Sequence, residues 1–376
     1  MPERADRPSV VVIGGAVAGA AAATHLARRG ARVTVVESAA FPRAKVCGEF
    51  VSPAATGMLE TILPPDQLRS LGARTVETLT IRLGNRTRSM PMPMPAWALG
   101  RRTLDGALLD AARCAGATIK QPERVTDVCY RPDGVRVDLA SGATLEADMV
   151  IHADGKGRYD PAGPTPQAAN LVGLKCHARL DEPVVGIRLH AGQGIYCGGI
   201  AIEDGLTTLA LCVTPNRLAQ FDRDKDALLA DVWPGFSAAH RVGPWLATGV
   251  ARSDVIRPGH ARSWRIGNAG AAVDPVGGEG MGLALWSAHA CAEAIGQAIT
   301  PRGYRGVSLR RAKRRYLGLA DARYRWRRPA CRLAAWALMT PAAWRTLSPA
   351  LASPRLVMAP WYRLTGKPIL SRPSPS

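Results

Sequence analysis

The chain has 376 residues, of which 47% are hydrophobic and 21% are charged. This length exceeds the roughly 250–300 residues at which a single hydrophobic core stops growing, so we expect two or more lobes. The composition excludes a disordered chain, and no run of about 18 apolar residues predicts a helix that spans a bilayer. The eight cysteines lack CxxC spacing and no signal-peptide pattern precedes the first predicted strand. We therefore expect no metal site, no disulfide framework and a reduced, cytoplasmic setting.

The net charge of +19 is concentrated at the C-terminal end of the chain. Residues 300–376 contain 17 Lys and Arg but one acidic residue, Asp321, so this tail carries +16 and the rest of the chain +3. A GC-rich genome explains an excess of Arg over Lys, but it does not remove acidic residues from one segment. The segregation therefore needs a physical reason.

The first predicted unit is a strand, a helix and a second strand. Residues 9–13 form a continuous apolar, β-branched run, which is typical of a parallel strand buried on both faces. A glycine-containing turn at 14–19 leads into an Ala-rich helix at 20–29, and Gly30 stands where a helix C-cap belongs. The next strand is predicted at 32–37, which completes a β-α-β unit.

The rest of the chain alternates between further helices and short strands. We predict a helix within 97–117 and a helix at 283–299, followed by a helical tail that prolines interrupt. Turn residues such as Asp133-Gly134 separate the predicted strands of the first half, and Asp204-Gly205 forms a tight turn in the second. The predicted strands are 78–83, 125–130, 135–139, 144–146, 149–151, 184–190, 195–202 and 206–213.

The turn after the first strand matches a dinucleotide-binding pattern. Gly14 and Gly19 occupy the first and third glycine positions of G-x-G-x-x-G, with Ala16 at the second and Ala18 beside the third. Such a turn brings backbone N–H groups and the N-terminus of a helix close to a pyrophosphate. Glu37, at the end of the second strand, suits the ribose hydroxyls and would repel a 2′-phosphate. We predict that these five residues contact a cofactor.

The segment 41–50 carries a more specific signal. Its residues Pro42, Lys45, Cys47, Gly48 and Glu49 form the pattern P-x-x-K-x-C-G-E. This resembles the segment after the ribose-binding Glu in FAD enzymes of the p-hydroxybenzoate hydroxylase superfamily, and within it the geranylgeranyl-reductase-like branch. The resemblance implies an FAD cofactor, with the backbones of Cys47 and Gly48 against it. We interpret the Cys47 side chain as a small packed residue, since no neighbouring His or Cys in the sequence would lower its pKa.

Further motifs follow in the order of that family. Residues 101–105 resemble its R-x-x-[LF]-D element, whose register selects Arg101 as the residue that meets the cofactor. Val125 matches a strand residue that touches adenine in relatives. Asp154-Gly155 resembles the family's D-G element near the pyrophosphate.

Two flavin-facing elements come last. Gly267-Asn268 occupies the G-D element, whose acid normally binds the ribityl chain. Asn268 is a departure that keeps hydrogen-bonding capacity but loses a charge. Gly280 and Met281 follow at the spacing of the flavin-facing G-E-G-[IM] element, and the next helix would direct its N-terminal N–H groups toward the negative charge of a reduced flavin.

The resemblance covers about residues 9–300 and implies an α/β fold. A Rossmann-like FAD-binding domain would carry an inserted β-sheet substrate domain and be followed by a basic helical tail. The expected FAD-binding domain is discontinuous, and the boundaries are 1–75, 97–165 and 255–300 for the FAD-binding domain, 76–96 and 166–254 for the substrate domain, and 301–376 for the tail.

The resemblance also implies an FAD-dependent oxidoreductase. We favour a monooxygenase that takes NAD(P)H as a transient reductant and hydroxylates a small apolar substrate of polyketide or isoprenoid type. An isoprenoid carbon–carbon double-bond reductase is the alternative, although the motif Y-x-W-x-F-P is missing and the nearest text is residues 196–200. Halogenation is less favoured, since W-x-W-x-I-P does not occur. A non-redox or degenerate flavin-binding protein stays open because of Ala16 and Asn268.

No catalytic residue follows from the sequence. Core packing is at least as good an explanation as cavity lining for Trp97, Tyr196 and Trp245. We interpret the remaining candidates for acid or base chemistry as structural histidines; these are His177, His190 and His240.

The basic tail has two interpretations. Its arginines are mixed with Leu, Tyr and Trp, which suits a helix on an anionic membrane surface at the inner face of the membrane. The same mixture suits an acidic carrier protein or a pyrophosphate-bearing substrate, and a solvated Arg-rich face over the core is an equal alternative. Nucleic acid is not expected, because no recognition module is visible and the main body is nearly neutral. The sequence does not predict an oligomeric state. The residues concerned are Leu309, Arg310, Arg311, Arg314, Arg315, Tyr316, Leu319, Arg325, Trp326, Arg327, Arg328, Arg332, Leu333 and Trp336.

Overall fold

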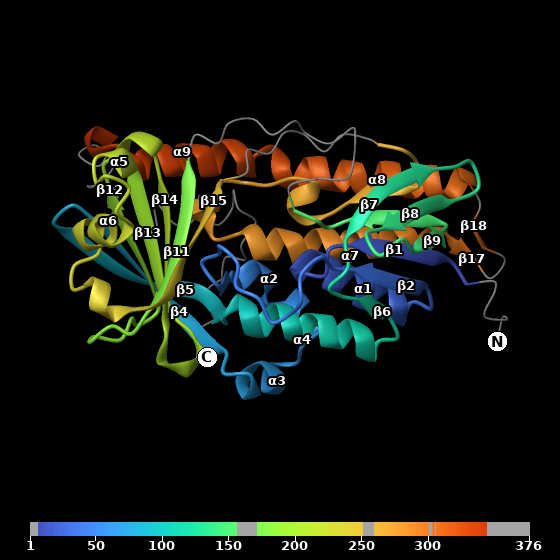
Figure 1. The fold of residues 1–376 in the computed structure, drawn as a ribbon. Helices are drawn as coiled ribbons and strands as arrows, with labels where there is room; N and C mark the ends of the chain where they lie inside the picture. The colour runs from blue at the N-terminus through green and yellow to red at the C-terminus, as the bar shows by residue number, and fades with distance from the viewer. Residues whose placement is uncertain (1–6, 156–170, 251–258, 301–302, 305, 344–376) are drawn as a thin grey trace, which may run out of the picture.

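The computed structural model describes residues 7–155, 171–250, 259–300, 303–304 and 306–343. Two sheets lie at opposite ends of an elongated molecule, and long helices run along its length between them (Figure 1). The expected α/β fold is confirmed. Within the described residues, no helix is both long and apolar enough to cross a bilayer.

One end of the molecule is a five-stranded parallel sheet in the order β16-β10-β1-β2-β6. Its central strand, β1, is fully buried, as its continuous apolar run predicts. All the carboxyl ends of parallel strands lie at one edge of the sheet, where ligands bind in such folds. The strands are β1 (Ser9–Ile13), β2 (Arg32–Val36), β6 (Thr118–Lys120), β10 (Met149–His152) and β16 (Ser263–Arg265).

Helices on one face and a small sheet on the other cover this parallel sheet. Helix α1 packs against α4 and α7, and the three share one hydrophobic core with the sheet. The antiparallel sheet β7-β8-β9 buries its apolar face against β1, β2 and β10. The elements are α1 (Val17–Arg28), α2 (Pro53–Glu60), α3 (Pro65–Ser70), α4 (Arg101–Cys114), α7 (Gly280–Ala298), β7 (Val125–Tyr130), β8 (Val135–Leu139) and β9 (Thr144–Ala147).

The other end is an eight-stranded sheet in the order β15-β11-β14-β13-β12-β4-β5-β3. Neighbouring strands are antiparallel except β12 and β4, which are parallel. Helix α6 packs on one part of the sheet through Leu228, Leu229 and Val232. The elements are β3 (Phe50–Val51), β4 (Arg74–Leu83), β5 (Arg86–Ala98), β11 (Val172–Ala178), β12 (Ile187–Gly192), β13 (Ile195–Ala201), β14 (Thr207–Val213), β15 (Arg241–Gly249), α5 (Pro215–Ala219) and α6 (Lys225–Val232).

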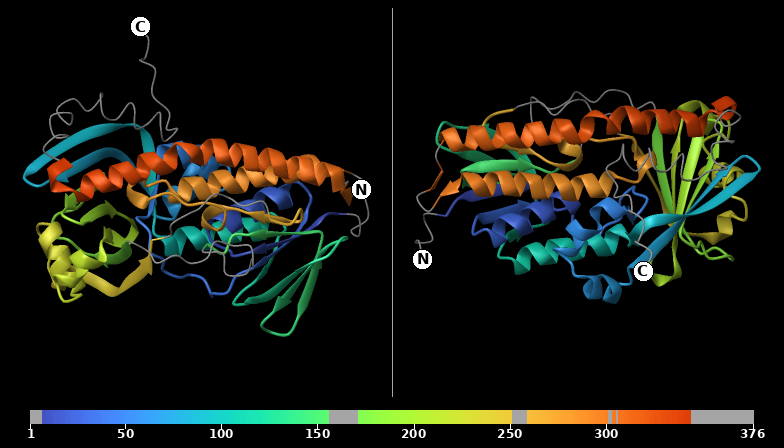
Figure 2. Two further views of the ribbon diagram at one scale, coloured as in Figure 1. Left: turned by 90° about the horizontal axis from the view of Figure 1, so that it is seen from above. Right: turned by 180° about the vertical axis from the view of Figure 1, so that it is seen from behind.

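The basic tail contributes two long helices, α8 (Gly306–Arg325) and α9 (Arg327–Met339). They form an almost continuous rod that runs beside α7 and reaches the eight-stranded sheet in every view (Figures 1 and 2). Two of the tail cations are buried in this packing. Lys313 donates hydrogen bonds to the carbonyls of Gly259, His260 and Ser263, and Arg327 bonds Glu279. The described part of the tail, α8 and α9, therefore belongs to the folded body, and residues 344–376 lie outside the described residues.

The predicted strands and helices are present, with shifts at their ends. The strand predicted at 184–190 begins only at Ile187, because Gly186 has a φ of +67° that a regular strand does not allow. Four strands of the eight-stranded sheet were not predicted: β3, β5, β11 and β15. The expected domain boundaries stay a prediction.

Candidate functional site

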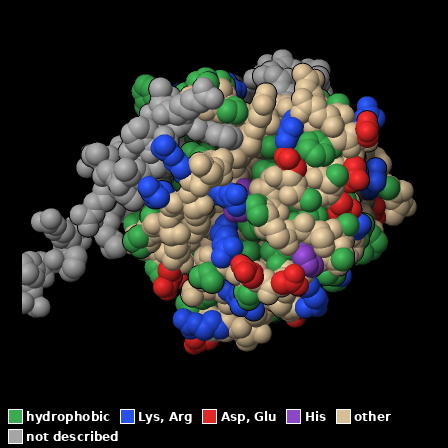
Figure 3. All heavy atoms as spheres, turned by 90° about the vertical axis from the view of Figure 1, so that its left-hand side faces the viewer, with side chains coloured by type: hydrophobic (Ala, Val, Ile, Leu, Met, Phe, Trp, Pro, Cys, Tyr) green, Lys and Arg blue, Asp and Glu red, His purple; other side chains and the backbone are tan. Residues whose placement is uncertain are grey.

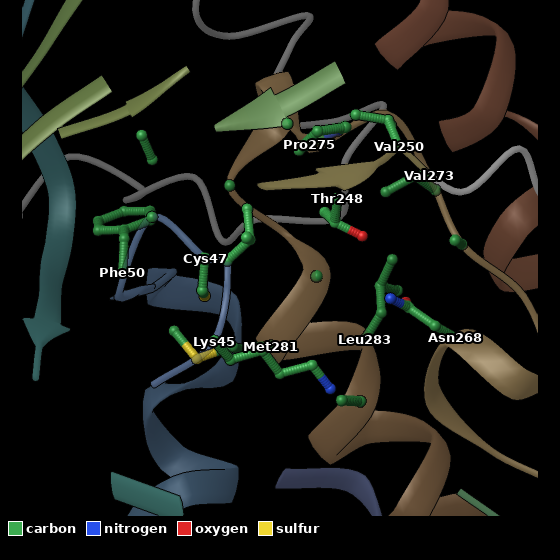
Figure 4. Close-up of a pocket in the computed structure, with 18 of the residues that line it drawn as sticks. Lys45, Cys47, Phe50, Thr248, Val250, Asn268, Val273, Pro275, Met281 and Leu283 are labelled. Atoms are coloured by element: carbon green, nitrogen blue, oxygen red, sulfur yellow. The ribbon is translucent and has the colours of Figure 1, made fainter. Parts of the chain in front are cut away.

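A single cavity of about 1330 Å³ extends from the carboxyl edge of the parallel sheet to the face of the eight-stranded sheet. Three groups of residues line it: the ends of β1, β2 and β10, the loop before α7, and side chains of the eight-stranded sheet and α9. Figure 4 shows Lys45 and Cys47, from the segment after β2, close to Met281 at one side of part of this space, with Leu283 and Asn268 at the other side.

The glycine turn after β1 fits closely against its neighbours. Gly14 has a φ of +99°, and a Cβ at this position would lie 2.7 Å from the carbonyl oxygen of Ala153. A Cβ on Gly19 would lie 1.8 Å from the oxygen of Gly14, so helix α1 can start here only with glycine. Ala16, the N-cap of α1, makes no side-chain hydrogen bond to the helix. The first N–H groups of α1 are therefore available to an anion at the cavity.

Glu37 follows β2 and is buried, with 3% of its surface exposed. Its Oε2 accepts a hydrogen bond from the N–H of Gly15 at 2.8 Å, and its Oε1 accepts one from the N–H of Ala39 at 2.9 Å. Arg43 lies 3.7 Å from the same Oε1. The carboxylate thus holds the glycine turn in place and lines the cavity beside it.

Lys45 and Arg101 bring positive charge to the cavity. Arg101, the first residue of α4, is buried and forms a two-pronged ion pair with Asp105, with both N–O distances at 2.7 Å. Burial, together with the charges of Arg101 and Arg43, lowers the pKa of Lys45 to about 8. The sequence singled out Arg101, but it gave Lys45 only as a letter of the P-x-x-K-x-C-G-E motif.

Glu49 forms a buried polar network that sequence reasoning missed. Its carboxylate lies 2.5 Å from the ammonium of Lys175 and accepts hydrogen bonds from His177 at 2.9 Å, from the N–H of Arg101 at 2.6 Å and from the hydroxyl of Thr208. Burial by itself would raise the pKa of Glu49, but the hydrogen bond from His177 and the charge of Lys175 outweigh it and hold the pKa at about 2. The network fastens the segment that lines the cavity to β11 and β14. In the sequence, the position of Glu49 at the end of the P-x-x-K-x-C-G-E motif was the one indication of this role.

The loop before α7 supplies the opposite side of the cavity. Asp274 caps a short turn by accepting a hydrogen bond from the N–H of Val276 at 3.0 Å. Gly278, at the end of that turn, has a φ of +62°, and a Cβ there would lie 2.9 Å from the ring of Phe50. Asn268 is exposed at the cavity, on the turn after β16. The backbone of this loop can therefore approach a planar ring closely.

The half of the cavity against the eight-stranded sheet is mainly apolar. Among its described residues, Tyr196, Cys212 and Thr248 are the polar lining side chains on the sheet. The hydroxyl of Tyr196 donates a hydrogen bond to Oδ1 of Asp274 at 2.9 Å. Burial raises the pKa of both groups above their ordinary values. The apolar lining includes Leu79, Ile81, Leu83, Met92, Leu174, Ile187, Leu189, Ile200 and Leu211 from the sheet and Leu333, Ala334, Trp336, Ala337 and Leu338 from α9.

The structure brings nearly all of the predicted cofactor-binding residues to this one cavity. Gly19 is the exception, since it packs behind the turn, against Gly14 and Ala153. The assignment of individual contacts to the cofactor stays a prediction. The lining residues among those predicted are Gly14, Ala16, Ala18, Glu37, Cys47, Gly48, Arg101, Val125, Asp154, Asn268, Gly280 and Met281.

Of the aromatic and histidine candidates, one lines the cavity and the others have structural partners. Tyr196 lines the cavity, whereas Trp97 bonds Glu60 and Trp245 bonds Asp226 in the hydrophobic cores. The three histidines have structural partners. His177 bonds Glu49, His190 bonds the carbonyl of Val232 and stacks on Trp233, and His240 pairs with Asp181.

The residues fit an extended adenine dinucleotide. The glycine cradle and the helix N-terminus suit a pyrophosphate, and the buried Glu37 carboxylate suits ribose hydroxyls. The cavity continues from that groove to the glycine loop before α7, where a flat ring can lie against backbone. The two loops thus border one space, as a single FAD molecule requires.

Comparisons with known proteins agree with this geometry. Residues 7–158 match the family model described as "FAD binding domain". The matched residues belong to the FAD-binding, Rossmann-like part of the fold, and the fold as a whole is similar to that of solved flavin monooxygenases and halogenases.

Individual relatives differ in activity. The chain is 29% identical over 330 residues to a menaquinone reductase of Mycolicibacterium smegmatis, a match that covers 76% of each chain. It is 28% identical over 160 residues to a 3-amino-4-hydroxybenzoate 2-monooxygenase of Streptomyces platensis, which covers 40% of each chain. Its fold is similar to that of the flavin-dependent brominase Bmp2, with a TM-score of 0.77, 19% identity and coverage of 96% of this chain and 94% of the brominase.

Proposed function

We propose that this flavoprotein reduces a carbon–carbon double bond of a long apolar substrate, of the isoprenoid-quinone class, with NAD(P)H as the reductant. The observation that carries the proposal is the continuity of the cavity. The space at the glycine loop before α7 opens into a chamber lined by Leu, Ile and Met side chains. Among the described lining residues of the eight-stranded sheet there is no Lys or Arg. Such a chamber favours an extended hydrocarbon chain over a small charged aromatic compound.

Similarity to relatives supports this substrate class. The match to menaquinone reductases extends over three quarters of the chain, whereas the match to the aromatic monooxygenase covers 40%. The P-x-x-K-x-C-G-E segment, which resembles the geranylgeranyl-reductase-like branch, also lies along the cavity through Lys45, Cys47 and Gly48. We therefore favour double-bond reduction, the alternative in the sequence analysis, over the hydroxylation that the sequence favoured.

The protein's own residues supply binding, exclusion of water and a proton. When bound, FAD supplies hydride chemistry, with NAD(P)H oxidised in exchange. Gly14, Ala16 and the N-terminus of α1 would hold the pyrophosphate, and Glu37 would hold a ribose. The aliphatic side chains of the eight-stranded sheet exclude water from the double bond.

Tyr196 is positioned to complete the reduction. Adding a hydride to one carbon of a double bond requires a proton at the other carbon. Oη of Tyr196 would donate that proton, and a proton taken up from water by Asp274, which is hydrogen-bonded to the same Oη, would replace it. Because burial raises the pKa of Asp274, this carboxyl is better able to carry a proton than an exposed aspartate is.

Anaerobic turnover tests this proposal. The FAD-loaded chain is incubated with NADPH and a short-chain isoprenoid quinone, and the masses of the products are measured by mass spectrometry. We expect a product two mass units heavier than the substrate after any reducing equivalents on the quinone ring have been reoxidised, formed equally well without oxygen. A product sixteen units heavier that forms only in air would reject reduction and support the second candidate, a monooxygenase. That candidate is favoured by the aromatic monooxygenase relative and by the missing Y-x-W-x-F-P motif.

A third outcome addresses a non-redox flavin-binding protein. The purified chain should be yellow, and its flavin absorbance should bleach under NADPH without oxygen. Flavin that dithionite bleaches but NADPH does not would reject the nicotinamide reductant while leaving the reductase reaction testable with dithionite.

A further inference from the structure

The exposed side of α8 and α9 carries a continuous apolar stripe. Six large hydrophobic side chains are exposed in the part of the chain that the structure describes. Three of them lie on these two helices, and a fourth, Trp326, is the residue between the helices. Leu319, Trp326 and Leu333 follow one another at intervals of two helical turns, and Trp336 lies one turn further on. Their exposed fractions are 47%, 66%, 64% and 58%. We call these four residues the α8–α9 stripe.

The two helices that carry the stripe are rich in exposed arginines, and acidic residues are nearly missing from their sequence. Asp321 is the single acidic residue in the sequence from 306 to 343, and it pairs with Arg325. The end of the molecule formed by the eight-stranded sheet differs, since acidic and basic side chains are interspersed there (Figure 3). The exposed arginines on the two helices are Arg310, Arg311, Arg314, Arg315, Arg325 and Arg332.

Packing against the core does not explain this arrangement. The inner faces of α8 and α9 already bury Leu309, Tyr316 and Tyr324, and the cations that serve the fold, Lys313 and Arg327, are buried with them. A solvated helix face needs neither exposed tryptophan nor six exposed arginines beside a single acidic residue. Tryptophan and leucine beside arginine are instead the composition of a helix that lies in the interface of an anionic bilayer.

The stripe also reaches the cavity. Leu333 and Trp336 are more than half exposed, and both line the cavity together with Ala334 and Ala337 of the same helix. The wall of the apolar chamber and the proposed lipid-facing surface therefore share α9. An isoprenoid chain dissolved in a bilayer could enter the cavity here without crossing water.

We propose that the α8–α9 stripe and its arginines dock the protein on a membrane surface rich in anionic phospholipid. The docking proposal depends only on the exposed side chains of α8 and α9. Loading of the cavity from the bilayer depends in addition on the proposed function. A phospholipid bilayer fits better than an acidic protein, because the stripe is a single convex helix face with arginines beside it rather than a groove for a partner chain.

Vesicle flotation of the full-length holoprotein tests docking without any turnover. We expect binding to phosphatidylglycerol vesicles in 0.05 M salt, little binding to phosphatidylcholine vesicles, and loss of binding at 0.5 M salt. The triple variant R310Q/R311Q/R314Q should bind phosphatidylglycerol about 100-fold more weakly. A matched triple variant at exposed arginines elsewhere, R88Q/R113Q/R223Q, should bind like the native chain.

The apolar part of the stripe is tested separately. The variant L319S/W326S changes two exposed residues that do not line the cavity, and it should bind phosphatidylglycerol vesicles about 10-fold more weakly. Flavin absorbance and thermal melting of each variant establish that it is folded. The proposal is overturned if the native chain does not bind vesicles. It is also overturned if the native chain and all variants bind both kinds of vesicle equally well. Binding of polyaspartate but not of vesicles would overturn it in favour of an acidic protein partner.

Loading from the bilayer has its own readout. With an isoprenoid quinone carried in vesicles, L319S/W326S should raise KM about 10-fold with kcat unchanged, and with the quinone in detergent both constants should match the native chain. An unchanged KM in vesicles would reject loading through α9. Docking without any turnover of the quinone would reject the proposed function and leave the docking surface standing.

Discussion

The two sheets contribute to the same cavity in different ways. The parallel sheet offers the ends of its strands, where glycine turns, backbone N–H groups and the buried Glu37 meet the space. The eight-stranded sheet offers the middle of its strands, where Leu, Ile and Met side chains face the space. Backbone geometry tolerates almost no substitution, whereas an aliphatic surface keeps its character under many. Substitutions at the parallel-sheet end would therefore disturb cofactor binding. Substitutions in the eight-stranded sheet could change the size and polarity of the substrate that the cavity accepts.

Gly19→Ala would break the cofactor end most severely. The added methyl would lie 1.8 Å from the carbonyl oxygen of Gly14, so the glycine turn must move. We expect a loss of at least about 3 kcal/mol in the free energy of unfolding and a purified chain without FAD. Thermal melting and the absorption spectrum measure both. Gly106→Ala in α4 is the matched control, because its Cβ meets no atom within 4 Å, and it should stabilise the chain by about 0.5–1 kcal/mol.

Lys175→Met tests the joint between the two ends. Removing the ammonium leaves the buried Glu49 carboxylate without its cation, which should lower the free energy of unfolding by about 3–5 kcal/mol. Urea unfolding measures this change. Arg69→Met, which removes the cation of the exposed pair with Asp66, should change stability by less than about 1 kcal/mol. Equal effects of the two variants would show that the buried network does not join the ends.

The same network predicts a dependence on pH. The pKa of Glu49 is about 2 in the folded chain, against 4.5 for the free side chain. Its stabilising contribution is therefore fully present above pH 4.5 and is lost as the pH falls toward 2. In urea unfolding between pH 6 and 2.5, Glu49→Gln should show a shallower fall in stability than the native chain. Parallel curves would contradict the assigned pKa.

Tyr196→Phe tests the one hydroxyl that the eight-stranded sheet shares with the loop before α7. Loss of the proton donor should lower kcat for double-bond reduction about 100-fold while the FAD content is unchanged. Stopped-flow measurement of flavin reduction by NADPH should be unaffected, since that step does not use the tyrosine. Tyr130→Phe removes a phenol that does not line the cavity and serves as the control. A native kcat for Tyr196→Phe would exclude this residue as the donor.

Asn268→Asp has the smallest expected effect and tests whether residue 268 contacts the ribityl chain of FAD. Restoring the acid of the family's G-D element should strengthen a hydrogen bond to a ribityl hydroxyl and tighten FAD binding about 10-fold. Fluorescence titration of the FAD-free chain measures the Kd. An unchanged Kd would place the ribityl chain away from Asn268.

Local patterns predicted the cofactor end well and the substrate end poorly. A β-α-β unit is contiguous, and its glycines carry meaning because of turns formed within a few residues. Strand β5 escaped prediction because Pro91, Pro93 and Pro95 interrupt it, although it lies next to the two-residue edge strand β3, where missing N–H donors are tolerated. Strand β11 escaped because Lys175 and His177 look like surface residues until Glu49 is placed beside them.

The dinucleotide turn, the acid after β2, the flavin-facing loop and the separation of charge into the tail can all be found in the amino-acid sequence. Each of these follows from residues close together in the chain, whose backbone geometry and charge act locally. Three-dimensional packing is needed to find that Tyr196 meets Asp274, that Lys175 neutralises Glu49, and that α9 closes one side of the cavity while exposing Trp336. Those contacts join residues far apart in sequence, and the packing of two sheets and a long helical rod brings them together.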